Sequence, residues 1–265
     1  MPSTRPSKHA VRQLKVMALA VALCASLDAA HAQDSRSMNE TRSNTGRNTT
    51  SDGLTARQQA IVPIAAFAAA GDIARLNTAL NEGLDSGLTI SDAKEILVQL
   101  YAYAGFPRSL NALGELMKVV EARRQRGFHD AAGNDPGAPI PKGDALLAAG
   151  TANQTKLSGA PVKGPLFEFA PAIDEYLKTH LFGDIFERKN LDWQSRELAT
   201  VGMLSSLAGA EPQLQAHMRI SMNVGLSAAQ LRQVAQVLAD RVGADNGRRA
   251  REALDQQLAG GAGSR

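Results

Sequence analysis

The segment Ser195–Gly225, SRELATVGMLSSLAGAEPQLQAHMRISMNVG, decides the fold because it contains two helix-like stretches joined by a Gly-Ala-Glu-Pro turn. In the second stretch Leu214 and Met218 belong to an apolar stripe whose members recur at spacings of three and four, which predicts an amphipathic helix. His217 lies beside Leu214 on the inward face of that helix. We therefore expect a titratable side chain next to an apolar core.

Helix signals recur along the rest of the chain. Thr89 and Asp92 form a capping pair for a helix that Gly105 ends, and Ser227 and Gln230 form the same pair for a later helix. No window alternates between polar and apolar residues and is bounded by hairpin turns. The sequence therefore predicts an all-α protein.

Composition divides the predicted helical region into two halves. Residues 54–126 contain three helix-like segments, and residues 166–245 contain the segment described first together with its neighbours. Residues 127–165 hold seven glycines and five prolines and are predicted as a linker with one helical turn near 144–149. Residues 246–265 are predicted as a disordered tail.

The N-terminus is predicted to direct export. Residues 1–32 comprise a basic region ending at Lys15, an apolar run and a small-residue site ending at Ala32, which are the three parts of a secretory signal peptide. An uncleaved amphipathic anchor is the alternative. Residues 33–53, rich in Ser, Thr, Asn and Arg, are predicted as a disordered leader. These features indicate an exported protein, in the periplasm of a bacterial host, with no membrane attachment after cleavage.

Charge and cysteine content narrow the classes of partner. The net charge is +3, but residues 1–32 carry four basic side chains and one acidic side chain, so the remainder is formally neutral. Composition therefore gives no argument for a nucleic-acid partner. The only cysteine, Cys24, lies inside the signal peptide, so the mature chain is expected to have no disulfide, thiolate metal site or cysteine redox centre.

No cofactor is expected either. The histidines of the mature chain are His129, His180 and His217, which are far apart and lack the spacing of metal ligands. No glycine-rich strand-to-helix loop is present for a nucleotide. The sequence therefore predicts chemistry without a metal or an organic cofactor.

The two halves are related by an internal repeat. Glycines, apolar residues and caps recur in the same order when Arg57 is aligned with Arg196, and the matched positions are Gly71 with Gly209, Leu76 with Leu214, Gly87-Leu88-Thr89 with Gly225-Leu226-Ser227, and Gly105 with Gly243. At the His217 position the first copy has Ala79, and at the Glu95 position the second copy has Gln233. Duplication followed by specialisation explains this pattern, and the histidine of any catalytic set belongs to the second copy.

Several blocks of sequence resemble the carboxymuconolactone decarboxylase family. They are FGDIFER at 182–188, LD at 191–192, REL at 196–198, His217, NVGL at 223–226 and, in the first half, KEILVQLYAYAGFPR at 94–108. The resemblance implies tandem helical repeats with the alkylhydroperoxidase-D-like fold. One-repeat relatives form rings of six units, so the resemblance implies a homo-oligomer in which three two-repeat chains build a similar pseudo-hexameric ring.

The resemblance also implies a choice of chemistry. Some relatives decarboxylate a muconolactone without a cofactor, whereas the peroxidase branch uses Cys-x-x-Cys followed, after three intervening residues, by a histidine. The positions matching those cysteines are Ala210 and Gln213, with His217 in register. The thiols of the peroxidase branch are therefore missing.

Four residues are candidates for the site. His217 is a candidate general acid or base, and the alternative is a core histidine bonded to a backbone carbonyl. Glu197 resembles the acidic position upstream of the peroxidase-branch histidine, with a spacing one residue longer, and the alternative is a solvated carboxylate in the first turn of its helix. Arg196 is suited to holding a substrate carboxylate or to an ion pair within the fold, and Arg219 is a weaker candidate for the same pocket.

Two tyrosines complete the set of candidates. Tyr101 and Tyr103 point about 200° apart around a helix, so we expect only one of them to face a pocket. Tyr101 belongs to the apolar stripe and is expected in the core. Tyr103 is expected on the surface.

The leading hypothesis from the sequence is a cofactor-free, decarboxylase-like lyase that acts on a small acidic or lactone-like compound. In this hypothesis His217 transfers a proton with Glu197 beside it. Arg196 or Arg219 binds the anionic group of the compound. The alternative is a non-catalytic member of the same fold that binds small molecules or serves assembly. A peroxidase is the least favoured interpretation because the thiol pair is missing.

Overall fold

The computed structural model describes residues 53–262. Within it the chain forms helices and no strand, so the predicted all-α fold is confirmed. The predicted signal peptide, 1–32, and leader, 33–53, lie outside the described residues apart from Gly53. The elements are α1 (Ala56–Ala70), α2 (Ile73–Asp85), α3 (Ile90–Gln99), α4 (Tyr101–Gln125), α5 (Asp144–Ser158), α6 (Pro165–Phe169), α7 (Pro171–Tyr176), the π-helix η1 (Leu177–Ile185), α8 (Trp193–Ser205), α9 (Glu211–Asn223), α10 (Ala228–Arg241) and α11 (Ala244–Ala262).

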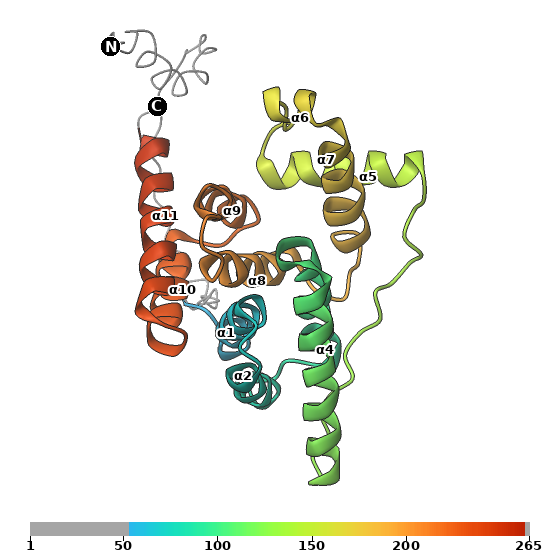
Figure 1. Cartoon of the computed structure of the whole chain (residues 1–265), viewed down its shortest axis with the longest axis vertical. Helices are drawn as coiled ribbons and strands as arrows, with labels where there is room; N and C mark the ends of the chain where they lie inside the picture. The colour runs from blue at the N-terminus through green and yellow to red at the C-terminus, as the bar shows by residue number, and fades with distance from the viewer. Residues whose placement is uncertain (1–52, 263–265) are drawn as a thin grey trace, which may run out of the picture. The chain divides into compact units, whose positions relative to one another are not determined.

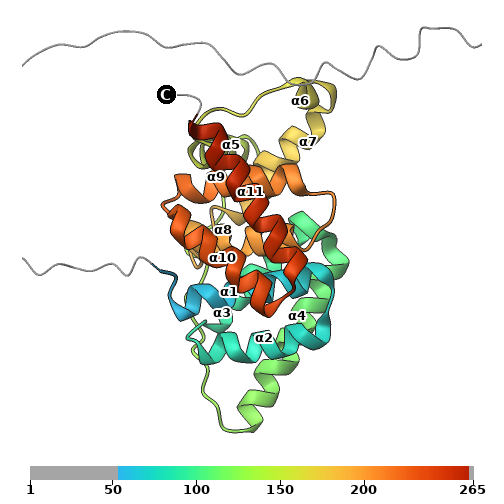
Figure 2. The ribbon, with the colours of Figure 1, turned by 90° about the vertical axis from the view of Figure 1, so that its left-hand side faces the viewer.

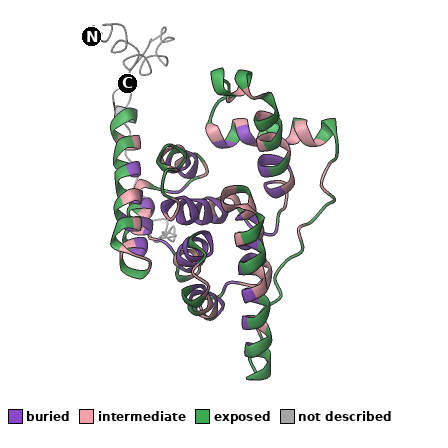
Figure 3. Ribbon diagram, viewed as in Figure 1, coloured by how far each residue is buried: buried purple, intermediate pink, exposed green. Residues whose placement is uncertain are grey.

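The helices form two sets of four, α1–α4 and α8–α11, which correspond to the two copies of the repeat. The first helix of each set, α1 and α8, pack against each other at the centre of the main core (Figure 1). Both are buried along most of their length (Figure 3). Gly202 permits their close approach, because a Cβ there would lie 2.7 Å from the carbonyl oxygen of Val62.

Local signals in the sequence account for the helix ends. The capping boxes predicted at Thr89 and Ser227 are both present, at the starts of α3 and α10. The aligned glycines Gly71 and Gly209 both adopt left-handed backbone conformations, with φ of 74° and 86°, that side chains disfavour. The two copies therefore share turn geometry as well as sequence, as expected for a duplication.

The first copy contains four helices where three are predicted. Gly71 ends α1 in a left-handed conformation, and the Asp72 side chain then caps α2 by accepting a hydrogen bond from the Arg75 amide. Gly105, predicted to end a helix, has φ 81° and ψ 162° inside α4 and breaks its helical path there.

Two regions predicted to be irregular are helical. The predicted linker contains a helix of 15 residues, α5, in place of the single turn expected near 144–149. The predicted disordered tail forms most of α11, which packs against α8, α9 and α10 (Figure 2). Ala250 and Leu254 of α11 are fully buried, so burial of an apolar stripe stabilises a segment whose composition favours disorder.

A second, smaller core lies where α5 meets η1 and α9. Its buried members are Leu157, Leu181, Phe182, Ile185, Phe186 and Ile220. The helices approach closely because α5 carries Gly150, where a Cβ would lie 1.7 Å from the carbonyl oxygen of Lys178. Among the described residues no helix is both long and apolar enough to cross a membrane.

Candidate functional site

His217 and Glu197 form a buried pair at the junction of α9 and α8. The Nδ1 atom of His217 lies 2.8 Å from Oε2 of Glu197. The exposed fraction is 8% for His217 and zero for Glu197. The interpretation of Glu197 as a solvated first-turn carboxylate is therefore wrong, because α8 is buried from Ser195 to Ser205. The structure brings these two predicted residues together.

The contact with Glu197 determines which ring nitrogen of His217 faces the pocket without a proton when the ring is neutral. A carboxylate accepts hydrogen bonds and does not donate them, so Nδ1 of His217 carries the proton in this contact. Nε2 is then the ring nitrogen available to a molecule in the pocket, as a base when the ring is neutral. Oε1 of Glu197 is buried and has no hydrogen-bond partner among residues 53–262. Buried polar atoms normally have a hydrogen-bond partner, so Oε1 is left open to one that residues 53–262 do not supply.

A pocket of about 450 Å³ opens beside His217. Its lining residues come from the start of α4, from α5 and the turn after it, and from η1, α8 and α9: Ala102, Tyr103, Gln154, Ser158, Val162, Leu177, Leu181, Phe182, Leu204, Leu207, Gly209, Ala210, Gln213, Ala216, His217, Arg219 and Ile220. Most of these side chains are apolar. The volume and lining are typical of a site for a small organic molecule with few polar groups.

Tyr103 also belongs to this pocket, although it was expected on the surface. Its ring meets that of His217 edge to face, with 5.8 Å between the ring centroids. Its hydroxyl lies 3.3 Å from Oγ1 of Thr200. Burial, and then the charge of Glu197, raise the pKa of the Tyr103 phenol, so the hydroxyl stays protonated near neutrality. The tyrosine reaches the second copy from α4 of the first, a contact between distant segments that helical periodicity does not reveal.

Arg196 does not line the pocket, which corrects its assignment as a substrate-binding residue. It is fully buried, and its Nη2 lies 3.0 Å from Oε2 of Glu95 on α3. Arg188 also pairs with Glu95, through Nε at 2.9 Å from Oε2. Arg196 therefore takes the alternative role considered for it, an ion pair within the fold. Gln99 extends this cluster, since its Nε2 donates to the Arg196 carbonyl and to Thr200.

The cluster is held in its charged form. Burial raises the pKa of Glu95, but hydrogen bonds from Arg188, Asn190 and Arg196 outweigh it and leave the pKa below its ordinary value. Burial lowers the pKa of Arg196, and the Glu95 carboxylate opposes that shift. The polar network thus runs from α3 of the first copy to Thr200, next to Tyr103.

The other predicted positions are at the pocket. Arg219 lines it and is exposed, and no ion pair involving it is present within residues 53–262. Ala210 and Gln213, which match the cysteines of the peroxidase branch, line it as well. The described residues contain no group of three or more His, Cys, Asp or Glu side chains that could hold a metal ion.

Comparison with known proteins identifies the family. No curated protein matches the chain at a significant level. The sequence model of the carboxymuconolactone decarboxylase family matches it twice, over residues 36–117 and 171–256. These two regions cover more than half of the chain and correspond to the two sets of four helices, and the second contains His217 and Glu197. The chain therefore belongs to the carboxymuconolactone decarboxylase family.

Proposed function

We propose that the protein is a cofactor-free acid/base enzyme that acts on a small acidic or lactone-like compound. The observation that carries the proposal is the buried His217–Glu197 pair, 2.8 Å apart, at the wall of a pocket of about 450 Å³. An imidazole oriented by a carboxylate is suited to proton transfer near neutral pH. Family membership supports this class of reaction.

The residues suit a decarboxylation followed by protonation. Loss of a carboxyl group as CO₂ leaves its bonding electron pair on carbon, where an adjacent carbonyl group can delocalise it. Protonated His217 then donates its Nε2 proton to that carbon. Glu197 keeps the ring in place and stabilises its positive charge, and the neutral Tyr103 hydroxyl offers a hydrogen bond to a developing oxyanion.

The rest of the pocket restricts the substrate. Arg219 at its rim offers a guanidinium to an anionic group, as an acidic substrate requires. The apolar walls favour a compact hydrocarbon or ring as the body of the molecule. We do not propose thiol-dependent peroxidase chemistry, because Ala210 and Gln213 occupy the positions of the two cysteines.

The proposal is tested by incubating the protein with a carboxymuconolactone and measuring the CO₂ that is released. His217→Gln should abolish CO₂ release and leave the melting temperature nearly unchanged, because glutamine can still bond to Glu197. His180 is a matched control: it is more than half exposed and pairs with Asp184 on its own helix, so His180→Gln should retain full activity. An unaltered rate in His217→Gln would refute the proposal.

The non-catalytic alternative predicts a different outcome of the same experiment. A pocket that only binds a ligand retains it without consuming it, and His217→Gln then changes affinity and not turnover. Binding of a carboxymuconolactone with no CO₂ release by the wild type would favour this alternative.

We further propose that the chain assembles with copies of itself. On α4, Phe106, Leu110 and Met117 form an exposed apolar stripe at helical spacing, each more than 60% exposed. A separate apolar patch on α6 and α7 includes Phe169, 89% exposed, and Tyr176. Two different patches on one chain fit a head-to-tail contact, which closes into a ring when the rotation permits.

Measurement of the molar mass in solution tests this assembly. Met117→Lys should lower the mass towards that of one chain, because a charge in a buried apolar contact is costly. A monomeric wild type would refute the proposal. Export likewise stays a prediction, tested by locating the mature chain after cell fractionation.

A further inference from the structure

One wall of the His217 pocket lies outside both family-matched regions. Residues 118–170 separate those regions, and α5 lies within this interval. The helix packs against α9, which carries His217, and against η1. Gln154 and Ser158 of α5 line the pocket together with His217. The helix that the sequence analysis assigned to a linker is therefore part of the candidate site.

The position of α5 is fixed by contacts on two sides. Asn223 of α9 donates its Nδ2 proton to the Leu157 carbonyl at 2.8 Å. Asn153 donates to the Phe182 carbonyl of η1 at 2.9 Å. At Gly150 the backbone of η1 fills the place of a side chain. The residues of α5 that face the pocket are therefore presented from a rigid support.

Gln154 is the unusual residue of this wall. It is only 4% exposed, and its amide makes no hydrogen bond with any residue in the range 53–262. The amide nitrogen and oxygen keep a small contact with solvent, so they are open to a partner that enters a pocket beside them. Gln154 lines the His217 pocket and also a second pocket of about 320 Å³.

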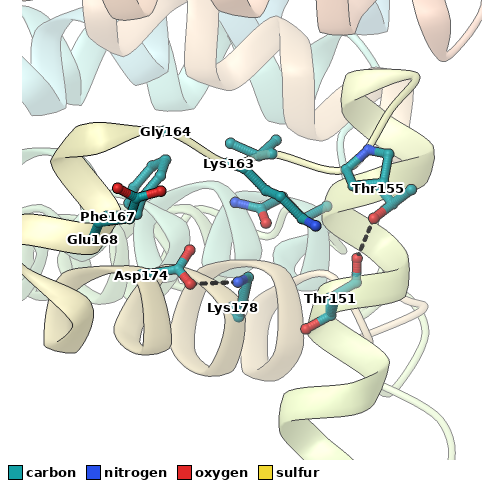
Figure 4. Close-up of a pocket in the computed structure, with 11 residues that line it drawn as sticks. Thr151, Thr155, Lys163, Gly164, Phe167, Glu168, Asp174 and Lys178 are labelled. Carbon is teal, nitrogen blue, oxygen red and sulfur yellow. Dashed lines mark hydrogen bonds and ion pairs between the residues drawn. The ribbon is translucent and has the colours of Figure 1, made fainter.

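The second pocket differs in character from the first. Thr151, Thr155, Lys163 and Lys178 lie around it, and Asp174 pairs with Lys178 across its floor (Figure 4). The hydroxyls of Thr151 and Thr155 donate to backbone carbonyls of their own helix, and Oδ1 of Asp174 is buried without a hydrogen-bond partner among residues 53–262. The walls of the His217 pocket are mostly apolar, so a polar side chain there can fix the orientation of a ligand.

We propose that Gln154 is a specificity-determining residue whose amide N–H donates a hydrogen bond to a carboxylate or carbonyl oxygen of a small, largely apolar ligand in the His217 pocket. The ligand class rests on the proposed function. Leu177, Leu181 and Ile220 enclose the apolar body, and His217 contacts the reacting end. Substrate selection is thereby assigned to a helix that the family sequence model does not cover.

Binding of two simple probes tests this inference. Benzoate and toluene share a ring and differ in the carboxylate, and their dissociation constants can be measured by ligand-detected NMR. Gln154→Leu keeps a similar volume and removes the amide. It should weaken benzoate binding roughly ten- to hundred-fold, as for loss of a hydrogen bond to a charged group, and change toluene binding less than about twofold. Gln256, exposed on α11, is the matched control, and Gln256→Leu should bind both probes as the wild type does.

The outcomes separate this inference from the proposed function. Equal weakening of both probes by Gln154→Leu would show that Gln154 only packs, and unchanged benzoate binding would show that it does not contact the ligand; each result overturns the inference and leaves the role of His217 intact. Failure of the wild type to bind either probe would overturn the inference, whereas the proposed function is decided separately by CO₂ release. The inference is supported only if the loss is selective for benzoate.

Discussion

Replacing Glu95 with glutamine should destabilise the fold through Arg196. The Arg196 side chain is fully buried, and Glu95 is its only carboxylate partner within residues 53–262. Glutamine removes the negative charge and leaves a guanidinium that water cannot reach. Breaking a buried pair in this way costs about 3–5 kcal/mol. We expect the lower end, about 3 kcal/mol, because Arg188 is 29% exposed and can be solvated.

Thermal unfolding followed by circular dichroism measures this effect. For a domain of this size about 3 kcal/mol corresponds to a fall in melting temperature of roughly 6–12 °C. Arg196→Met should cost less, roughly 1–2 kcal/mol, because Glu95 loses one partner but keeps Arg188, and no buried charge is left without a partner. Glu82→Gln, which removes an exposed pair with Arg241, is the control and should shift the melting temperature far less.

The same variants test whether Arg196 belongs to the site. Arg196→Met should keep its affinity for benzoate, because Arg196 does not line the pocket. A variant that melts like the wild type and no longer binds the probe would refute the structural role assigned to Arg196.

Three further predictions follow from the packing and charge of the described residues. Gly150→Ala should lower stability by roughly 1–3 kcal/mol, because its Cβ would lie 1.7 Å from the Lys178 carbonyl oxygen. Gly114 has open space around it, so Gly114→Ala should not lower stability, and thermal melts of the two variants make the comparison. Tyr103→Phe should lower kcat roughly three- to tenfold at an unchanged melting temperature, and full activity would exclude the hydroxyl from the mechanism. The folded-state pKa of Glu95 lies below the ordinary 4.5, so the stability that its charge contributes is present above pH 4.5 and is lost as the pH falls through the lowered value. Thermal melts from pH 7 to 3 should therefore show the difference in melting temperature between wild type and Glu95→Gln decreasing in acid.

Much of the fold could be predicted because its signals are local. The capping boxes at Thr89 and Ser227 and the helix break at Gly105 depend on neighbours in sequence. The prediction of disorder for residues 246–265 rested on their composition and is wrong for residues 246–262, whereas the internal repeat indicates a helix there. Gly105 precedes most of α4, and its counterpart Gly243 immediately precedes α11, so extending the alignment beyond Gly243 would have predicted a helix there.

The candidate site was less accessible to sequence reasoning because it joins distant segments. His217 and Glu197 could be proposed from the family resemblance, and both lie in one helix pair. Tyr103 reaches them from the other copy, and Gln154 reaches the pocket from a segment rich in glycine and proline. Neither residue carries a local signal of its position, since each is placed by the packing of α4 and α5 against α8 and α9.

The two copies differ in the partners of their aligned arginines, Arg196 and Arg57. The ion pair of Arg196 joins the copies, because its partner Glu95 belongs to the first. The counterpart of Glu95 is Gln233, which cannot neutralise an arginine and instead accepts a hydrogen bond from the Leu54 amide at 2.7 Å. Arg57, the counterpart of Arg196, pairs with Asp92 at 2.9 Å and stays one-third exposed.

The His217 position shows the same divergence. Its counterpart Ala79 is 3% exposed and belongs to the main apolar core, so the first copy has a packing residue where the second has the histidine of the candidate site. Tyr103 nevertheless crosses from the first copy to His217, and Glu95 supports the helix that carries Glu197. The first copy is therefore not a spare site. It supplies part of the pocket wall, through Ala102 and Tyr103, and the buried carboxylate that pairs with Arg196 on the helix carrying Glu197.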